Sequence, residues 1–288
     1  MPYHVITHSG KAHIDEILAI AVLAVHQGEQ PEEIRRIPSD ESARMVSAQE
    51  VPADTWVVDC GLAFDSRRRL FDHHQDGSLP SAALLMFRHL FPELEGSDLS
   101  DYFELVSKVD TGGLRSLEDI DSVGESRDYW SFPQQVLVRV FEKDPAAVVN
   151  LVSVGLTDKI EFEEEKKAAA EWVGVPGRLV DVEIGGLVAL EYTEHPPESL
   201  VNGLKGIDRD VIREHQAAVI YGYDKEDPSI RTLYRTDIGH DLVDFTRSKP
   251  SEMLFNHQGG FLLRFKPADP EEWKRIIKAS ALGSPREI

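Results

Sequence analysis

The sequence predicts an α/β protein: a mostly parallel sheet with helices on both faces, followed by a smaller α+β domain. Short β-branched and aromatic runs alternate with apolar helical stretches in the first half of the chain. The 288 residues are 41% hydrophobic and 28% charged, which is typical of a globular protein. After residue 174 the pattern changes to closely spaced strand-like runs. We therefore place a domain boundary between residues 1–173 and 174–288.

In the first part, strands are expected to alternate with helices. Tyr3–Thr7 is a short β-branched and aromatic run, and a helix rich in Ala, Ile and Leu is expected over Asp15–Gln27. Ser39, Asp40 and Glu41 are expected to cap the next helix. The remaining strands are expected over residues 33–37, 55–58 and 69–71, and the remaining helices over residues 42–48, 82–90, 98–109, 132–142 and 145–172.

The second part begins at a Gly-Val-Pro-Gly break over residues 174–177. Strand-like runs cover residues 178–182, 187–192, 217–221, 230–234 and 261–265, and helices are expected over residues 241–247 and 271–279. This mixture predicts the smaller α+β domain.

Composition excludes several classes of protein. The one cysteine, Cys60, rules out an intrachain disulfide or a cysteine-rich zinc module. The longest apolar run, Ile17–Val25, is shorter than the roughly 20 residues of a membrane span. The N-terminus lacks the features of a secretory signal, so a cytoplasmic protein is expected. A net charge of −20 argues against long duplex nucleic acid, whereas a short anionic substrate fits. The sequence does not determine the oligomeric state, and a homo-oligomer is compatible with it.

Acids and histidines gather at the ends of predicted strands. Asp72, His73 and His74 follow the run Arg69–Phe71, and Asp59 follows the strand over residues 55–58. Ligands collect beyond the carboxyl ends of strands in such sheets, so these side chains are expected to meet. Imidazole and carboxylate groups together suit manganese, iron or zinc. The further potential ligands in this half are His8, His13, Asp15 and Asp110.

Each of these residues has a simpler explanation when taken alone. Asp15 could be a favourable charge at a helix N-terminus, and Asp110 a residue before a Gly-Gly turn. Their joint placement at strand ends favours a metal site. His13 and Asp15 lie two apart and need not share a helical face, which suits two ions better than one.

Four segments, His8–Glu16, Val58–Gly61, Phe71–Gln75 and Val109–Gly112, resemble the successive motifs of the DHH phosphoesterase superfamily. Within it, the closest likeness is to the melanocyte-proliferating-gene family. The resemblance implies two divalent ions, usually Mn2+, with Zn2+, Fe2+ or Mg2+ as alternatives. It also implies hydrolysis of phosphodiester or phosphoanhydride bonds, since the family is associated with 3′-to-5′ exoribonuclease activity.

The resemblance also assigns roles by position. Asp59 would bridge the two ions and His74 would contact the scissile phosphate, which makes these the expected catalytic residues. Asp72 would orient a ligating histidine through its other ring nitrogen. The implied ligands are His8, His13 and Asp59 for one ion, and Asp15, Asp59, His73 and Asp110 for the other.

Several residues are hypothetical substrate contacts. Lys11 could neutralise a phosphate or be a solvated loop lysine. Residues 256–261 loosely resemble a Gly-rich substrate motif of the superfamily, so His257, Gly259 and Gly260 could contact a phosphate; the alternative is a hairpin turn. Arg231 and Arg235 lie four apart on one face of a predicted strand and could also bind phosphate, the alternative being an ordinary surface pair.

These inferences predict a dinuclear-metal-dependent phosphodiesterase that hydrolyses short RNA or small nucleotide phosphodiesters. A metal-bound hydroxide would attack phosphorus. One alternative is an inorganic pyrophosphatase or nucleotide phosphatase, because the same ions could cleave an anhydride. The other is a metal-binding regulatory protein without catalytic activity.

Overall fold

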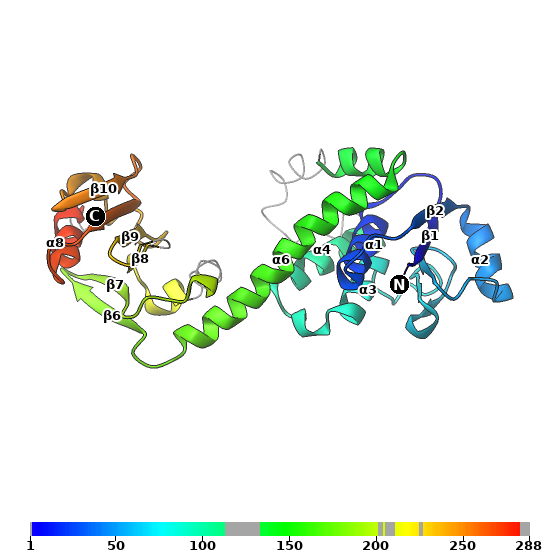
Figure 1. Cartoon of the computed structure of the whole chain (residues 1–288), viewed down its shortest axis with the longest axis horizontal. Coiled ribbons are helices and arrows are strands. Elements are labelled where there is room, and N and C mark those ends of the chain that lie inside the picture. Colours follow the sequence, from blue (N-terminus) through cyan, green and yellow to red (C-terminus); the bar gives the residue numbers. More distant parts are fainter. Residues whose placement is uncertain (1, 113–132, 201–203, 205–210, 225–226, 283–288) are drawn as a thin grey trace. The chain divides into compact units, whose positions relative to one another are not determined.

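A computed structural model describes residues 2–112, 133–200, 204, 211–224 and 227–282 (Figure 1). The chain divides into two compact units, Met1–Glu163 and Glu164–Ile288, and the long helix α6 (Pro145–Val173) runs from the first into the second. The sequence-based boundary at residue 174 lies further along, at the end of this helix. The division into a catalytic and a substrate-binding domain stays a prediction.

The first unit is built on a five-stranded sheet with the order β2-β1-β3-β5-β4. Strand β1 pairs in parallel with both β2 and β3, and β3 pairs in parallel with β5; only β4 is antiparallel to its neighbour. The predicted, mostly parallel sheet is therefore confirmed. The strands are β1 (His4–His8), β2 (Glu33–Ile37), β3 (Thr55–Val58), β4 (Phe64–Asp65) and β5 (Leu70–Phe71).

Helices cover both faces of this sheet. Alternate strand residues point to opposite faces, so Val5 and Val58 pack with α1, α3 and α4, whereas Ile6 and Val57 pack with Val46 of α2. The predicted layering is confirmed. These helices are α1 (Ile14–Gln27), α2 (Ser39–Ala48), α3 (Ala82–Leu90) and α4 (Asp98–Gly112). The 3-10 turn η1 (Ser66–Arg68) lies between β4 and β5, and η2 (Pro92–Leu94) lies between α3 and α4.

The second unit is an α+β structure, as predicted. Its six-stranded sheet has the order β10-β11-β9-β8-β7-β6, and only the pair β7 and β8 is parallel. Helix α8 (Glu272–Ser280) packs on this sheet, with Trp273 stacked on Tyr221 at 4.3 Å between ring centroids. The strands are β6 (Leu179–Ile184), β7 (Leu187–Tyr192), β8 (Val219–Tyr223), β9 (Arg231–Arg235), β10 (Glu252–Asn256) and β11 (Leu262–Lys266).

Some predicted elements differ from the structure. Helix α2 begins at Ser39, so the predicted cap by Ser39, Asp40 and Glu41 is wrong: the N-cap is Pro38, which has no polar side chain to cap the helix. The helix expected over residues 241–247 is wrong: the only helical turn there is η5 (Phe245–Arg247), capped by the side chain of Asp244. Strands β4 and β10 were not predicted, and of the helix expected over residues 132–142 the described residues 133–141 are helical. The remaining short turn is η4 (Glu198–Leu200).

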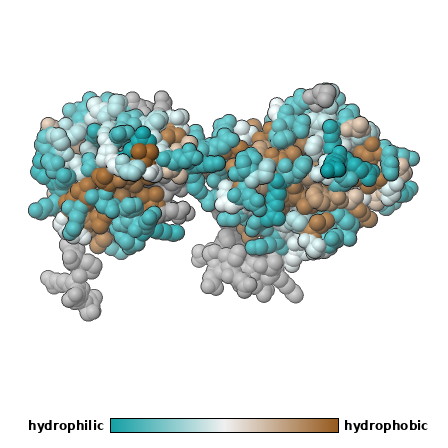
Figure 2. All heavy atoms as spheres, turned by 90° about the horizontal axis from the view of Figure 1, so that it is seen from below, coloured by the Kyte–Doolittle hydropathy of each residue, from teal (hydrophilic) through white to brown (hydrophobic). Residues whose placement is uncertain are grey.

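Hydrophilic residues make up much of the visible surface (Figure 2). On the face shown in Figure 2, hydrophilic residues surround separate hydrophobic patches. Among the described helices, none combines the length and apolar character that crossing a membrane requires.

Candidate metal centre

A strained turn after β3 presents Asp59. Asp59 and Leu62 both adopt the left-handed region, with φ of 54°, and Gly61 lies between them at φ 100°. Non-glycine residues rarely adopt this conformation, and where they do the strain often accompanies function. A Cβ at Gly61 would lie 2.9 Å from Cγ2 of Val46 and 3.1 Å from Cγ1 of Val57, so only glycine fits. The Asp59 amide donates to the Phe71 carbonyl at 2.8 Å, which fixes the turn against β5.

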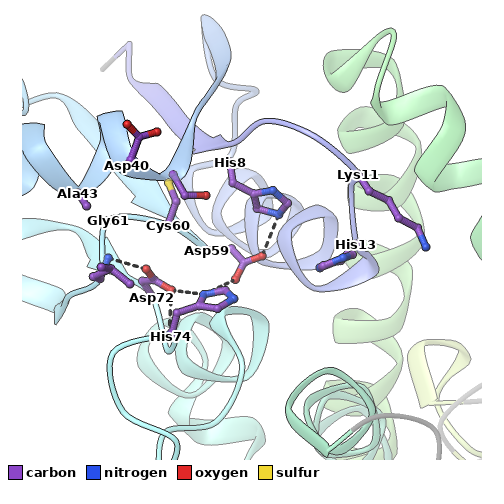
Figure 3. Close-up of a pocket in the computed structure, with 12 residues that line it drawn as sticks. His8, Lys11, His13, Asp40, Ala43, Asp59, Cys60, Gly61, Asp72 and His74 are labelled. Atoms are coloured by element: carbon purple, nitrogen blue, oxygen red, sulfur yellow. Dashed lines mark hydrogen bonds and ion pairs between the residues drawn. The ribbon is translucent and has the colours of Figure 1, made fainter.

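The Asp59 carboxylate is buried between histidines from two other segments. Its Oδ2 lies 3.4 Å from Nε2 of His8, and its Oδ1 lies 3.8 Å from Nδ1 of His74 (Figure 3). The same Oδ1 lies 3.4 Å from Nε2 of His73. The two oxygens thus face opposite partners. A bridging ligand requires this arrangement.

Among the described residues, the acids and histidines form three groups whose ligand atoms all lie within 4.8 Å of one another. Asp59 belongs to two of the groups, and so does His73. The structure therefore brings together all six residues that the sequence suggested as ligands. The groups are His8, His13, Glu16 and Asp59; Asp59, His73 and His74; and Asp15, His73 and Asp110.

The first group includes an acid that the sequence analysis missed. Glu16 is fully buried in the first turn of α1; its Oε2 contacts Nε2 of His8 and accepts a hydrogen bond from the His13 amide at 3.1 Å. The ring of His8 is held from the other side, since Nδ1 donates to the Ser9 carbonyl at 3.1 Å. That bond leaves Nε2 as the ring atom that could bind a metal. The spacing of three between His13 and Glu16, typical of a helix start, is the signal that could have found it.

The third group combines Asp15 of α1, Asp110 of α4 and His73 from the segment after β5. Both oxygens of Asp15 accept backbone amide hydrogens at the start of α3, from Ala82 and Ala83, at 3.0 Å each. Asp110 was expected just beyond a helix but lies inside α4, which continues to Gly112. Its Oδ2 is 3.2 Å from Nε2 of His73.

The electrostatics of the centre favour positive charge. Burial, together with repulsion from Asp59 and Asp110, raises the pKa of Asp15. The carboxylates of Asp110 and Asp59, which lie 3.2 and 3.4 Å from its Nε2, raise the pKa of His73 to about 10. Burial opposes protonation of His8, yet its bonds to Asp59 and Glu16 outweigh this and raise its pKa to about 10. The carboxylates thus attract protons to these rings, and a divalent cation would answer the same demand.

The donor atoms fit a bound ion. Oδ1 of Asp59 and Nε2 of His73 are buried and have no hydrogen-bond partner, which is costly unless another group satisfies them. Ligand atoms that share an ion at about 2.1 Å lie roughly 3 to 3.4 Å from each other. The separations of 3.4 Å between Asp59 and each of His8 and His73, and of 3.2 Å between His73 and Asp110, match this. Mixed nitrogen and oxygen donors suit Mn2+, Fe2+ or Zn2+.

Asp72 holds the neighbouring segments of this centre in place through hydrogen bonds. Its Oδ1 accepts from Nδ1 of His74 at 2.7 Å and from the His73 amide at 2.8 Å, and its Oδ2 accepts from the Leu62 amide at 2.6 Å. Its ring contact is thus with His74. Burial would raise the pKa of Asp72, but the bonds to His74 and Leu62 outweigh it and lower the pKa. The side chain of His74 is 52% exposed and available to a ligand.

A pocket of about 510 Å3 opens beside the centre, within the usual size range of small-molecule sites. In Figure 3 the side chain of Lys11 extends away from Asp59 and His74. Cys60 is buried and its thiol pKa is raised to about 12, chiefly by burial, so it is a core residue. The pocket is lined by His8, Lys11, His13, Ser39, Asp40, Ala43, Asp59, Cys60, Gly61, Leu62, Asp72 and His74.

The second unit holds the Gly-rich segment in the hairpin between β10 and β11. The Gly260 amide donates to the His257 carbonyl at 2.8 Å, and the His257 amide to the Leu262 carbonyl at 2.9 Å. Nδ1 of His257 accepts from the Gly259 amide at 3.0 Å. The turn that was the alternative explanation is therefore present, and a substrate contact of these residues stays a prediction.

The two arginines of β9 lie at opposite ends of one strand face. Arg231 stacks over the ring of Tyr223 at 3.5 Å, whereas Nη1 of Arg235 donates to the Val243 carbonyl at 2.9 Å. Nη1 of Arg231 is buried without a hydrogen-bond partner. The two guanidinium groups thus have separate surroundings, and their phosphate contact also stays a prediction.

The model of the MYG1_exonuc family, described as "Uncharacterised protein family (UPF0160)", matches residues 4–82. The first part of this chain is similar to that family. The matched segment includes five of the six suggested ligands, Asp110 being the exception. The predicted resemblance is confirmed over these residues.

Other comparisons add less. No curated protein matches the chain. Among solved structures, the chain is similar to the crystal structure of RecJ in complex with Mn2+ from Thermus thermophilus, with 14% identity and a TM-score of 0.32. The match covers 96% of this chain but 51% of the RecJ chain, so the chain spans about half the length of that protein.

Proposed function

We propose that the chain is a phosphodiesterase that depends on two divalent ions, Mn2+ being the best fit, and hydrolyses short RNA or small nucleotide phosphodiesters. The name of the matching family model, MYG1_exonuc, refers to an exonuclease, so we also propose that the chain removes nucleotides from the end of its substrate. A short substrate agrees with the net charge of −20.

One observation carries the proposal. Asp59 is buried with one oxygen directed to His8 and the other to His73, so a single carboxylate joins two ligand sets. In such centres, two ions about 3.5 to 4 Å apart stabilise the attacking and leaving oxygens of a displacement at phosphorus. Only a shared ligand keeps ions that close, which makes Asp59 the centre of the proposed site.

The chain's own residues would divide the remaining work. His8, His13 and Asp59 would hold one ion, and Asp15, Asp59, His73 and Asp110 the other. His74 would contact the scissile phosphate: Asp72 holds its Nδ1, which leaves Nε2 to meet a substrate oxygen. Asp72 raises the pKa of His74, so that ring carries a proton more readily and can donate to a phosphate.

Hydrolysis of an end-labelled, short oligoribonucleotide tests the proposal. With MnCl2 the purified chain should release nucleoside monophosphates, and Asp59→Asn should slow this by at least about 100-fold, because the bridging carboxylate is lost. Asparagine tolerates the left-handed conformation of residue 59, so the turn is retained.

Asp76→Asn is the matched control. Asp76 lies in the same loop as Asp72, but its carboxylate is exposed and accepts from the amide and hydroxyl of Ser78. This variant should keep the activity of the native chain. Full activity of Asp59→Asn would contradict the bridging role, and release of phosphate from pyrophosphate alone would replace the phosphodiesterase with an anhydride hydrolase.

A further inference from the structure

The loop between β1 and α1, residues 9–13, carries one of the two histidines of the first group and is held by side chains from three other segments. Arg36 of β2 donates to the Gly10 carbonyl at 3.2 Å. The Ala12 amide donates to Oε1 of Glu142 at 3.2 Å, and the His13 amide to Glu16. A loop without secondary structure of its own is thus fixed at three points along its length.

Arg36 is the residue that connects these contacts. Its Nη2 lies 3.3 Å from Oε1 of Glu16 and also bonds the loop carbonyl, while the guanidinium carbon lies 5.3 Å from the centre of the Phe141 ring. The side chain of Glu16 is fully buried and that of Arg36 is 13% exposed. Buried charges persist only where they are paired, so each of the two fixes the other.

The two carboxylate oxygens of Glu16 contact different partners. Oε1 faces Arg36, whereas Oε2 contacts the ring of His8 and the amide of His13. Arg36 therefore fixes the Glu16 carboxylate, and this carboxylate in turn contacts both histidines of the first group. Register places Arg36 beside Thr7 of β1, next to His8, so the strand pairing itself holds the guanidinium at this point.

We propose that Arg36 is a positioning residue for the metal centre, acting through Glu16 and the Gly10 carbonyl to hold His8 and His13 at ligand geometry. Nothing in its charge suits it as a ligand, because a guanidinium repels a cation. Arg36 would act only by holding the ligands in place. Its charge alone would weaken metal binding, whereas its support of the ligands would strengthen it, so the two effects can be separated by experiment. The inference rests on the proposed metal centre.

The experiment is calorimetric titration of the metal-free chain with MnCl2, which needs no substrate. Arg36→Met removes the guanidinium. Coulomb repulsion alone predicts tighter Mn2+ binding in this variant, whereas positioning predicts binding weaker by about 10-fold or more, the loss usual when support of a metal ligand is removed. Arg36→Lys keeps the charge without the planar fork and should fall between Arg36→Met and the native chain.

Arg35→Met is the matched control. Arg35 is the exposed neighbour of Arg36 on the opposite side of β2, and its removal subtracts the same charge without touching the loop. It should leave Mn2+ affinity within about twofold. If Arg36 acts through Glu16, the double variant Arg36→Met with Glu16→Gln should bind no more weakly than the weaker of the two single variants.

Hydrolysis adds a second readout. Excess Mn2+ should restore much of the kcat of Arg36→Met with the substrate KM unchanged, because only the ion is held less well. Equal or tighter Mn2+ binding in Arg36→Met would overturn the inference, and so would a raised KM that Mn2+ does not correct, which would make Arg36 a substrate contact. Should Arg36→Met fail to fold, the titration of Arg36→Lys decides: Mn2+ binding weaker than in the native chain supports the inference, and equal or tighter binding overturns it. Absence of Mn2+ binding by the native chain would instead contradict the proposed function.

Discussion

The two units differ in how their suggested site residues are satisfied. In the first, side chains from β1, α1, the segment after β5 and α4 gather around Asp59 and His73 and leave buried donor and acceptor atoms without partners. In the second, His257 and Arg235 bond to backbone in nearby turns and loops. Nη1 of Arg231 is also buried without a hydrogen-bond partner, but among the described residues no group of potential metal ligands forms there. Convergence of distant segments on unsatisfied atoms is therefore a stronger sign of a site than a local motif.

Hydrogen exchange with and without Mn2+ should give the largest contrast. Binding at 100 times the dissociation constant stabilises the native state by about 2.7 kcal/mol. We expect slower exchange in peptides covering β1, α1 and β3, and unchanged exchange in peptides covering β9 to β11. The chain with Asp59→Asn, compared in the same buffer, should lose the difference. Equal protection of both units would break the comparison.

Two glycine substitutions compare the two units by their effect on the free energy of unfolding. Gly61→Ala should destabilise the chain by roughly 2 kcal/mol, because residue 61 has a φ of 100° and its new methyl group would meet Val46 and Val57. Gly259→Ala is the counterpart in the hairpin. There the nearest atoms belong to the rings of His257 and Phe261, at 3.2 and 3.3 Å, and can move, so the loss should stay below about 1 kcal/mol.

Urea unfolding measures both variants by the shift of the midpoint at constant slope. Similar losses at the two positions would show that the turn after β3 is no more constrained than an ordinary hairpin.

The smallest effect is expected for His257→Asn. Nδ1 of His257 accepts from the Gly259 amide inside the turn, so its replacement should change the hydrolysis rate by less than about threefold, as for other surface substitutions. His73→Asn, measured in parallel, should cost at least about 100-fold. A loss at His257 as large as at His73 would make the hairpin part of the site.

Periodicity was a good guide to regular elements and a poor one to turns. The bounds of β2, β3, β7 and α3 match the sequence-based ranges, because apolar runs with clear ends specify them. The helix expected over residues 241–247 is absent, since Asp244 bonds Thr246 locally and Gly239 and Gly260 bring the chain close to its neighbours. Edge strand β10 carries little alternation, with Met253, Leu254 and Phe255 all exposed.

The residues of the centre were predictable in type but not in their contacts. His8, Asp59 and His73 stood at strand ends, which a parallel sheet brings together. Glu16 and Arg36 escaped notice because an acid in a first helical turn and a basic residue on a strand have ordinary explanations. Only their burial against each other in three dimensions separates them from such residues.

The contacts of the centre span long stretches of chain. Asp15 accepts from Ala82 and Ala83 across 67 and 68 residues, and Ala12 donates to Glu142 across 130. Contacts of such sequence separation form late, because closing long loops costs entropy before any bond compensates. A nascent or partly folded chain would therefore carry every proposed ligand without the assembled site. At the proposed centre, metal capture would then be the final step of folding, and a tightly bound ion would report that helices far apart in the sequence have already docked.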